Sequence, residues 1–203
     1  NLEYQNYTKN GGEMSLKQFR LHHTNDLIKR VYGVIKNIDE KIVFSISPDG
    51  NINNNYYYHY ADIKTWLNSN EYIDMIMPQI YYGFNNQYKP FEDTFLEWKN
   101  LIKNEKIKLV PILAFYKSGN IDENAGTGKE EWVNNHDIIK RQINLIRNKE
   151  SYGFGVFRYN FLYNENYLVN ETIYNISKHG FAKNMIFDIT LKEPSKITFK
   201  LSS

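Results

Sequence analysis

Four short runs rich in apolar and β-branched residues recur along this chain, centred near residues 44, 77, 111 and 156. The segments between them carry apolar residues at helical spacing, so the pattern predicts a strand–helix unit repeated four times. Strands that are apolar throughout are typical of a parallel sheet buried on both faces, and right-handed crossovers would place the helices outside it. An open doubly wound sheet and part of an eight-stranded barrel both satisfy this pattern.

Local signals set the expected element boundaries. Ser15 is a suitable N-cap for a helix that continues to Ile38. Residues 1–14, with Gly11-Gly12 as a hinge, indicate a loop, and we expect further loops over 51–60 and 116–130. The expected strands cover residues 42–47, 73–82, 108–115 and 153–159, and the other expected helices cover residues 61–68, 90–103, 135–148 and 167–178.

The strand ends distinguish the two architectures. Each run finishes with polar or aromatic groups, as in a (β/α)8 barrel, where the carboxyl ends of successive strands carry the site. A dinucleotide-binding fold would instead place a glycine-rich phosphate loop after one strand. No G-x-G-x-x-G is present, and Gly126-Thr127-Gly128-Lys129 lacks the spacing of a P-loop. We therefore predict an α/β protein of parallel βα repeats that belong to a TIM barrel.

Composition excludes several function classes. A net charge of +2 over 203 residues disfavours wholesale binding to nucleic acid, and no apolar run is long enough to predict a membrane span. The absence of cysteine removes disulfides and thiolate zinc sites. Aromatic residues make up 16% of the chain. Either the composition is biased toward Asn, Lys, Ile and Tyr, or the aromatic faces serve flat, polyhydroxylated ligands such as sugars.

Two stretches carry motifs of a known family. The first is Ile46-Ser47-Pro48-Asp49-Gly50, followed by Asp62-Ile63-Lys64-Thr65-Trp66-Leu67, and the second is Y-I-D-M-I-M-P-Q-I-Y-Y at residues 72–82. In order and spacing they resemble the I-S-P-x-G, D-x-x-x-W and W-I-D-Y-I-x-P-Q-I-Y-W motifs of the glycosyl-hydrolase-like family 10 barrels. The resemblance covers roughly residues 10–116, with a looser continuation to residue 159.

This resemblance implies an exported, glycosidase-like (β/α)8 barrel of bacterial cell surfaces that acts on or binds polysaccharide, cell-wall glycan included. The I-S-P and P-Q-I-Y strands correspond to strands five and six of the family. Residues 1–180 are then expected to form the C-terminal half of a barrel, about four βα units, and residues 181–203 a tail that pairs as edge strands. The family's best acid candidates would precede residue 1. The expected partner of this half is the N-terminal barrel half or a second copy of the chain.

Asp49 is the one clear carboxylate at a predicted strand end, although the family more often has an apolar residue there. Glycoside hydrolysis typically uses two carboxyl groups, so a catalytic pair would be incomplete in this chain. Asp74 enters its strand at the opposite end and is interpreted as structural. Glutamates on helices and in the loop after the third strand, Glu131 among them, are expected to be solvated.

The remaining rim residues suit the holding of a polysaccharide or oligosaccharide. Amides can pair with hydroxyls, and tyrosine rings can stack on sugars. Side chains alternate along a strand, so Gln79 and Tyr81 share one face, while Tyr82 packs under the helices unless the strand has already ended. The predicted substrate-binding residues are Gln79, Tyr81, Tyr82, Tyr116, Lys117, Arg158, Tyr159 and Asn160.

Several residues have two interpretations. Arg158, flanked by aromatic residues in a strand, is costly unless paired, and its expected partner is Asp49 or an anionic substrate. Trp66 and Trp98 are expected to pack helices on strands, whereas Trp132 suits either packing or sugar stacking. The five histidines lack ligand spacing, so no metal or cofactor is expected, and only His59 is placed over the cleft.

Three functions stay open at this point. The first is a glycoside hydrolase, with this chain supplying the substrate-binding half of the cleft. The second is a non-catalytic carbohydrate-binding domain, and the third is a structural domain of the cell surface. All three place the protein outside the cell or on its surface.

Overall fold

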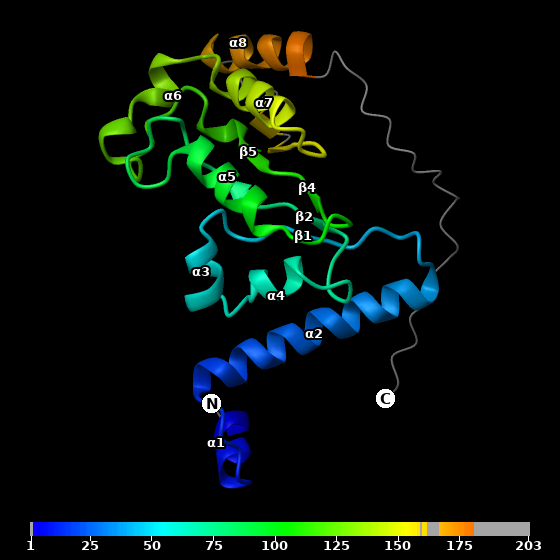
Figure 1. Ribbon diagram of the computed structural model, residues 1–203. Helices are drawn as coiled ribbons and strands as arrows, with labels where there is room; N and C mark the ends of the chain where they lie inside the picture. The colour runs from blue at the N-terminus through cyan, green and yellow to red at the C-terminus, as the bar shows by residue number, and fades with distance from the viewer. Residues whose placement is uncertain (1, 159, 162–166, 181–203) are drawn as a thin grey trace.

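A computed structural model of the chain describes residues 2–158, 160–161 and 167–180 (Figure 1). The strands run through the middle of the molecule, between α4 (Ile63–Leu67) on one side and α7 (Ile138–Asn148) on the other. The expected edge strands over 181–203 lie outside the described residues. No helix in the described ranges is both long enough and apolar enough to cross a membrane.

The strands form two short parallel ladders. β1 (Ser45–Ile46), β2 (Met75–Ile76) and β4 (Lys108–Leu109) make the first, and β3 (Gln79–Ile80), β5 (Ile112–Ala114) and β6 (Gly155–Phe157) make the second. Every pair is parallel, with Ile46 opposite Ile76 and Ile80 opposite Leu113. The predicted parallel direction of the four successive runs is confirmed, and the protein is a mixed α/β structure.

Prolines divide the expected continuous strands into short pieces. Pro78 separates β2 from β3, and Pro111 lies between β4 and β5, because proline has no N–H to donate to the ladder. Their carbonyls still accept from the next strand. The N–H of Gln79 donates to Pro48 at 2.9 Å, that of Ile112 to Pro78 at 2.8 Å, and that of Gly155 to Pro111 at 2.9 Å. One row of proline carbonyls therefore joins all four runs.

The helices α2 (Leu16–Ile38), α4, α5 (Phe91–Leu101), α7 and α8 (Tyr167–Asn175) correspond to expected ones. Ser15 caps α2 in a reciprocal capping box with Gln18, as predicted. The structure also contains the short α6 (Glu131–Asn134), a π-helical turn at Ile176–Gly180, and 3₁₀ turns at Phe115–Lys117 and Gly126–Gly128.

Two predicted loops contain helices. α1 (Leu2–Lys9) lies in the segment predicted as a loop, and it packs through Tyr4 and Tyr7 against Phe19 of α2. α3 (Ile52–Tyr57) lies in the Asn- and Tyr-rich segment, where Asn51 caps it by accepting from the N–H of Asn53 at 3.0 Å. Tertiary contacts outweigh weak local propensity in the first segment, and the Asn51 cap does so in the second.

The core lies between the strands and their covering helices. Ile76, Ile80 and Leu113 of the strands are fully buried against Trp98 of α5 and Ile143 of α7. The predicted packing role of Trp66 and Trp98 is confirmed, since both are buried. Their indole nitrogens donate to Asn25 and to the carbonyl of Gly50, each at 2.7 Å.

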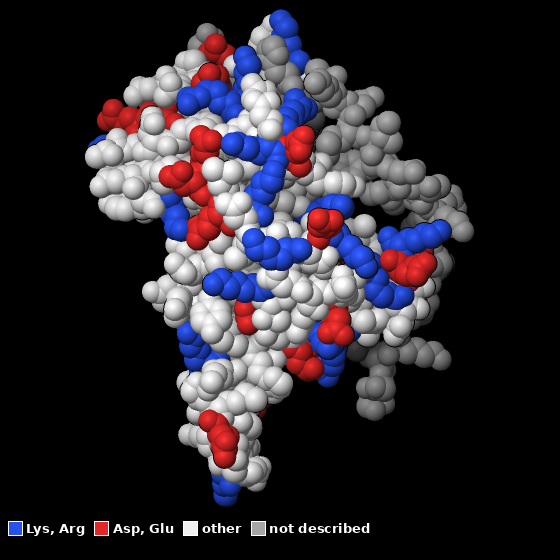
Figure 2. All heavy atoms as spheres, in the orientation of Figure 1, with Lys and Arg blue, Asp and Glu red and all other residues white. Residues whose placement is uncertain are grey.

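Asp74 lies at the amino ends of the strands, away from the rim. It accepts from the backbone N–H of Phe44 at 2.8 Å and from the Tyr32 hydroxyl at 3.1 Å, and it pairs with Lys36 at 2.7 Å. This agrees with the structural role predicted for it. Over the face shown in Figure 2, basic and acidic side chains are interspersed, as a net charge near zero leads one to expect.

Candidate functional site

Asp49 and Gln79 meet at the carboxyl ends of neighbouring parallel strands. They form an isolated parallel bridge just beyond β1 and at the start of β3. Gly50 permits this approach, because a Cβ at that position would lie 2.4 Å from the carbonyl oxygen of Gln79. A cavity of about 540 Å³ opens beside the bridge. It is lined by Ile46, Ser47, Pro48, Asp49, Gly50, Asn55, His59, Ala61, Trp66, Gln79, Tyr81 and Tyr82.

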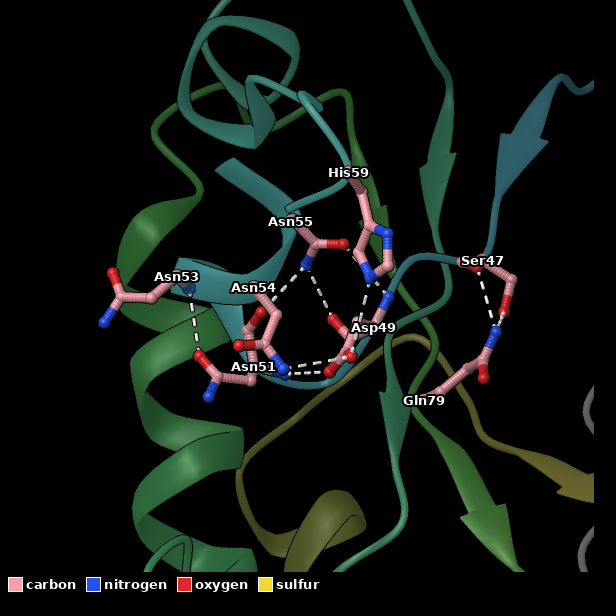
Figure 3. Close-up of polar contacts among 8 residues, drawn as sticks. All are labelled: Ser47, Asp49, Asn51, Asn53, Asn54, Asn55, His59 and Gln79. Carbon is pink, nitrogen blue, oxygen red and sulfur yellow. Dashed lines mark hydrogen bonds and ion pairs between the residues drawn. The ribbon is translucent and has the colours of Figure 1, made fainter. Parts of the chain in front are cut away.

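The Asp49 carboxylate sits in a frame of asparagines (Figure 3). One oxygen accepts from the N–H of Asn51 at 2.7 Å, and the other accepts from the Asn54 amide at 3.3 Å. Buried Asn55 holds the backbone of Asp49 on both sides, accepting from its N–H at 3.1 Å and donating to its carbonyl at 2.7 Å. The loop from β1 into α3 therefore fixes the orientation of this carboxylate.

The His59 imidazole faces the Asp49 carboxylate. Its Nε2 atom lies 3.9 Å from the outer carboxylate oxygen, and Figure 3 shows the ring facing Asp49 across the mouth of the Asn frame. The two side chains are 58% and 32% exposed, so solvent and ligands reach both. An acid–base pair of this kind can exchange a proton with a bound hydroxyl.

The Gln79 side chain contacts the segment that follows β1. Its amide nitrogen donates to the carbonyl of Ser47 at 3.1 Å (Figure 3). A second cavity, of about 480 Å³, lies beside Gln79 and is lined in part by residues of β5 and β6. It shares Ser47, Gln79 and Tyr81 with the first cavity and adds Met77, Ile112, Gly155, Val156 and Phe157. The two cavities thus meet along the line from Ser47 to Tyr81.

Aromatic rings gather at the ends of three strands. The Tyr81 ring stacks on Phe157 at 5.8 Å between centroids and meets Tyr116 edge-on at 5.7 Å. Phe161 lies 6.2 Å from Tyr116. Burial raises the pKa of Tyr81 to about 12 and raises that of Tyr116 as well. Both phenols stay protonated over the physiological range, so each can donate a hydrogen bond to a sugar hydroxyl.

Tyr82 is half-buried, and it lines the Asp49 cavity together with Gln79 and Tyr81. It does so because β3 ends at Ile80, so strict strand alternation no longer applies to Tyr82. Burial raises its pKa to about 12, and the charge of Asp49 adds to the effect.

Lys117 is placed differently from its predicted role. Its Nζ donates to the carbonyl of Tyr81 at 2.8 Å and pairs with the buried carboxylate of Asp122 at 2.6 Å. Lys117 is absent from the lining of both cavities among the described residues. It therefore ties the loop after β5 to the end of β3.

Arg158 is exposed, and the expected pairing with Asp49 is wrong. Its guanidinium lies 5.1 Å from the Phe161 ring and 6.0 Å from that of Phe157. The burial penalty behind that expectation is absent because the strand ends at Phe157. Asn160 is also exposed, and Tyr159 lies outside the described residues.

Two buried polar residues that the sequence patterns did not predict bind the backbone of residues 82–85, just after β3. Glu131, expected to be solvated, accepts from the N–H groups of Phe84 and Asn85 at 3.0 and 2.8 Å. Gln142 donates to the carbonyl of Tyr82 at 2.9 Å. The burial of Gln142 could have been predicted from its place among the apolar residues of α7. No local sequence feature predicts the burial of Glu131. Its neighbour Trp132 is buried, which settles its role as packing.

The geometry defines an α/β protein whose parallel strands bring a carboxylate, an amide and tyrosines to one end. Comparison with known proteins shows its family. The profile of the family Glycosyl hydrolase-like 10 matches residues 1–133, and the chain belongs to this family.

Curated relatives carry glycosyl hydrolase names. The chain is 28% identical over 156 residues to the glycosyl hydrolase DigH of Escherichia coli (strain K12), a match that covers 68% of this chain and 34% of DigH. It is 27% identical over 160 residues to the glycosyl hydrolase YngK of Bacillus subtilis (strain 168), covering 71% of this chain and 31% of YngK. The chain thus spans about a third of the length of these relatives.

Proposed function

We propose that this chain forms the substrate-binding half of a glycoside hydrolase cleft that acts on polysaccharide or cell-wall glycan, outside the cell or on its surface. Membership of the glycosyl hydrolase-like family and the names of the relatives support the hydrolase class. The single observation that carries the proposal is the bridge between Asp49 and Gln79, with Tyr81 and Tyr82 lining the same cavity.

Each residue has a chemical task in this proposal. Asp49 accepts a hydroxyl hydrogen bond or a proton at its outer oxygen, where the weaker of its hydrogen bonds leaves room. Gln79 orients a sugar hydroxyl through its amide, and the ring of Tyr81 provides an apolar face against the sugar ring. The fixed loop around Asp49 holds these groups in place before substrate arrives.

A second carboxyl group must come from elsewhere. Among the described residues that line the two cavities, Asp49 alone carries a carboxylate, whereas the usual mechanism needs a pair. We propose that residues 1–180 form the C-terminal half of a (β/α)8 barrel and that the strands completing it bring the partner carboxylate.

The open faces of the sheet support this arrangement. Within the described ranges, β1 pairs only with β2, and β6 pairs only with β5. Phe157, which lines the second cavity, is 43% exposed. Unpaired parallel edges and an uncovered inner face favour association, so the N-terminal barrel half or a second copy of the chain is the proposed cover.

A non-catalytic carbohydrate-binding domain is the second candidate. The observation that favours it is the lone carboxylate, which already accepts two hydrogen bonds from the Asn frame. Such a domain would bind glycan through Gln79 and Tyr81 without needing a partner acid.

The test compares binding and turnover. The chain and a longer protein carrying a complete barrel are incubated with purified peptidoglycan sacculi and with chitohexaose, and bound protein and new reducing ends are measured. We expect binding by both proteins and turnover by the longer one, both lowered in Asp49→Asn and Gln79→Ala. The control is Asp26→Asn, on the exposed surface of α2. Binding without turnover by either protein would select the second candidate, and no binding to any glycan would contradict both.

A further inference from the structure

His59 is exposed, so burial does not hold it beside Asp49. Its position depends on the backbone on either side. The N–H of His59 donates to the carbonyl of Asn54 at 3.1 Å, and that of Ala61 donates to Asn55 at 2.8 Å. Between these two bonds lies Tyr60, which completes the turn that brings the His59 ring back over the cavity.

Tyr60 adopts a backbone conformation that tyrosine rarely takes. Its φ of 53° lies in the left-handed region, which disfavours residues with a bulky side chain. Such a conformation persists only where the surroundings over-determine it. The two flanking backbone hydrogen bonds contribute to this, and a contact on the Tyr60 side chain adds to them.

Arg20 of α2 supplies that contact from 40 residues away. Its Nη1 donates a hydrogen bond to the Tyr60 hydroxyl, and its guanidinium carbon lies 4.7 Å from the centroid of the Tyr60 ring. Among the described residues, no acidic side chain forms an ion pair with Arg20. The Arg20 guanidinium thus contacts Tyr60 through both a hydrogen bond and a cation–π interaction.

We propose that Arg20 and Tyr60 are positioning residues of the candidate site, which hold the His59 imidazole against the Asp49 carboxylate. α2 then does more than cover the strands, because it sets the geometry of the acid–base pair through one side chain. The value of this positioning for glycan chemistry rests on the proposed function, whereas the positioning itself does not.

The first test needs no ligand. In the folded chain, NMR cross-relaxation (NOE) between the His59 ring protons and the β protons of Asp49 reports the pair, and the Cα shift of Tyr60 reports its left-handed backbone. We expect the NOE to fall below detection in Arg20→Met and to weaken in Tyr60→Phe, which keeps the ring but loses the hydroxyl. Arg20→Lys, which keeps a cation, should restore part of it.

Arg30→Met is the matched control, since Arg30 lies on the same helix and pairs with Asp26. It should leave the NOE unchanged. If Arg20→Met does not fold, Tyr60→Phe alone decides. An undiminished His59–Asp49 NOE in the folded variants, with a normal Tyr60 shift, would overturn the proposal and leave Arg20 as a stabilising contact only.

A second measurement separates this proposal from the proposed function. Binding to chitohexaose and to peptidoglycan sacculi is compared in Arg20→Met, His59→Ala and the double variant. If the contact between Arg20 and Tyr60 acts through His59, the double variant binds glycan no more weakly than His59→Ala. Additive losses would contradict the proposal. Absence of glycan binding in every protein would defeat the proposed function, while the NOE result would still decide the role of Arg20.

Discussion

The indole nitrogen of Trp98 donates a 2.7 Å hydrogen bond to the carbonyl oxygen of Gly50, the residue directly after Asp49. Trp98 is fully buried on α5, so this hydrogen bond fixes the loop that carries the candidate carboxylate to the core. Trp98 therefore belongs to the packed core and also contacts the candidate site, so mutations in the core are expected to weaken ligand binding at the site.

Replacement Trp98→Phe tests that coupling. It leaves the Gly50 carbonyl without its donor and opens space in the core, so we expect the free energy of unfolding to fall by about 1–3 kcal/mol. Urea unfolding followed by fluorescence measures the loss, and glycan binding should weaken in parallel. A change within about 0.5 kcal/mol, typical of surface substitutions, would show that the contact is dispensable.

Replacement Gly50→Ala tests the close approach of the two strand ends. The new Cβ would meet the backbone oxygen of Gln79 at 2.4 Å, so the Asp49–Gln79 bridge must open. We expect a destabilisation of about 1–3 kcal/mol together with weaker glycan binding.

Gly33→Ala is the control for that substitution. Gly33 lies within α2, and a Cβ added there would have no neighbouring atom within 4 Å outside the helix's own local backbone. Alanine should stabilise the helix at this position by about 0.5–1 kcal/mol. Equal effects at Gly50 and Gly33 in thermal or urea unfolding would contradict the steric argument.

Replacement Lys117→Met tests the tie between the loop after β5 and β3. It leaves the buried Asp122 carboxylate unpaired, which we expect to cost about 3–5 kcal/mol. The double variant Lys117→Met/Asp122→Asn should recover most of the loss, because no buried charge is then left alone. Lys89→Met, which removes a more exposed pair with Glu97, should cost less than about 1 kcal/mol. Similar losses for Lys117→Met and Lys89→Met would refute the assignment.

The tyrosines predict the response to alkali. Burial raises the folded-state pKa of both Tyr81 and Tyr82 to about 12, whereas an unfolded tyrosine titrates near 10. Their contribution to stability is therefore complete below pH 10 and is lost as the pH rises from 10 to 12. Urea unfolding of Tyr81→Phe/Tyr82→Phe should show a shallower fall over that range than the parent chain. Identical slopes would exclude the raised pKa values.

How far the sequence predicts this structure differs between elements. The parallel order of the strands follows from four apolar runs with helices between them, and the cap at Ser15 is a local signal. The breaks in the strands at Pro78 and Pro111 were not predicted, because the surrounding residues are strong β-formers. The missing N–H outweighs that propensity at single positions.

The positions of the candidate residues were predictable where they depend on strand ends and unpredictable where they depend on long-range contacts. Asp49 and Gln79 follow directly from the register of neighbouring strands. Glu131 contacts residues 46 and 47 positions earlier, and no periodicity in its own helix indicates such partners. Arg158 was misjudged because the last strand is shorter than its apolar run, which leaves the guanidinium in solvent.

The most direct measurement is an NMR titration of the isotopically labelled chain with chitohexaose and with soluble fragments of cell-wall glycan. The account predicts saturable amide shifts that cluster on residues 47–50, 79–82 and 155–158, and that vanish in Gln79→Ala. Shifts confined to the outer faces of α5 and α7, or no shift with either glycan, would contradict the claim that the carboxyl ends of these parallel strands form a glycan cleft.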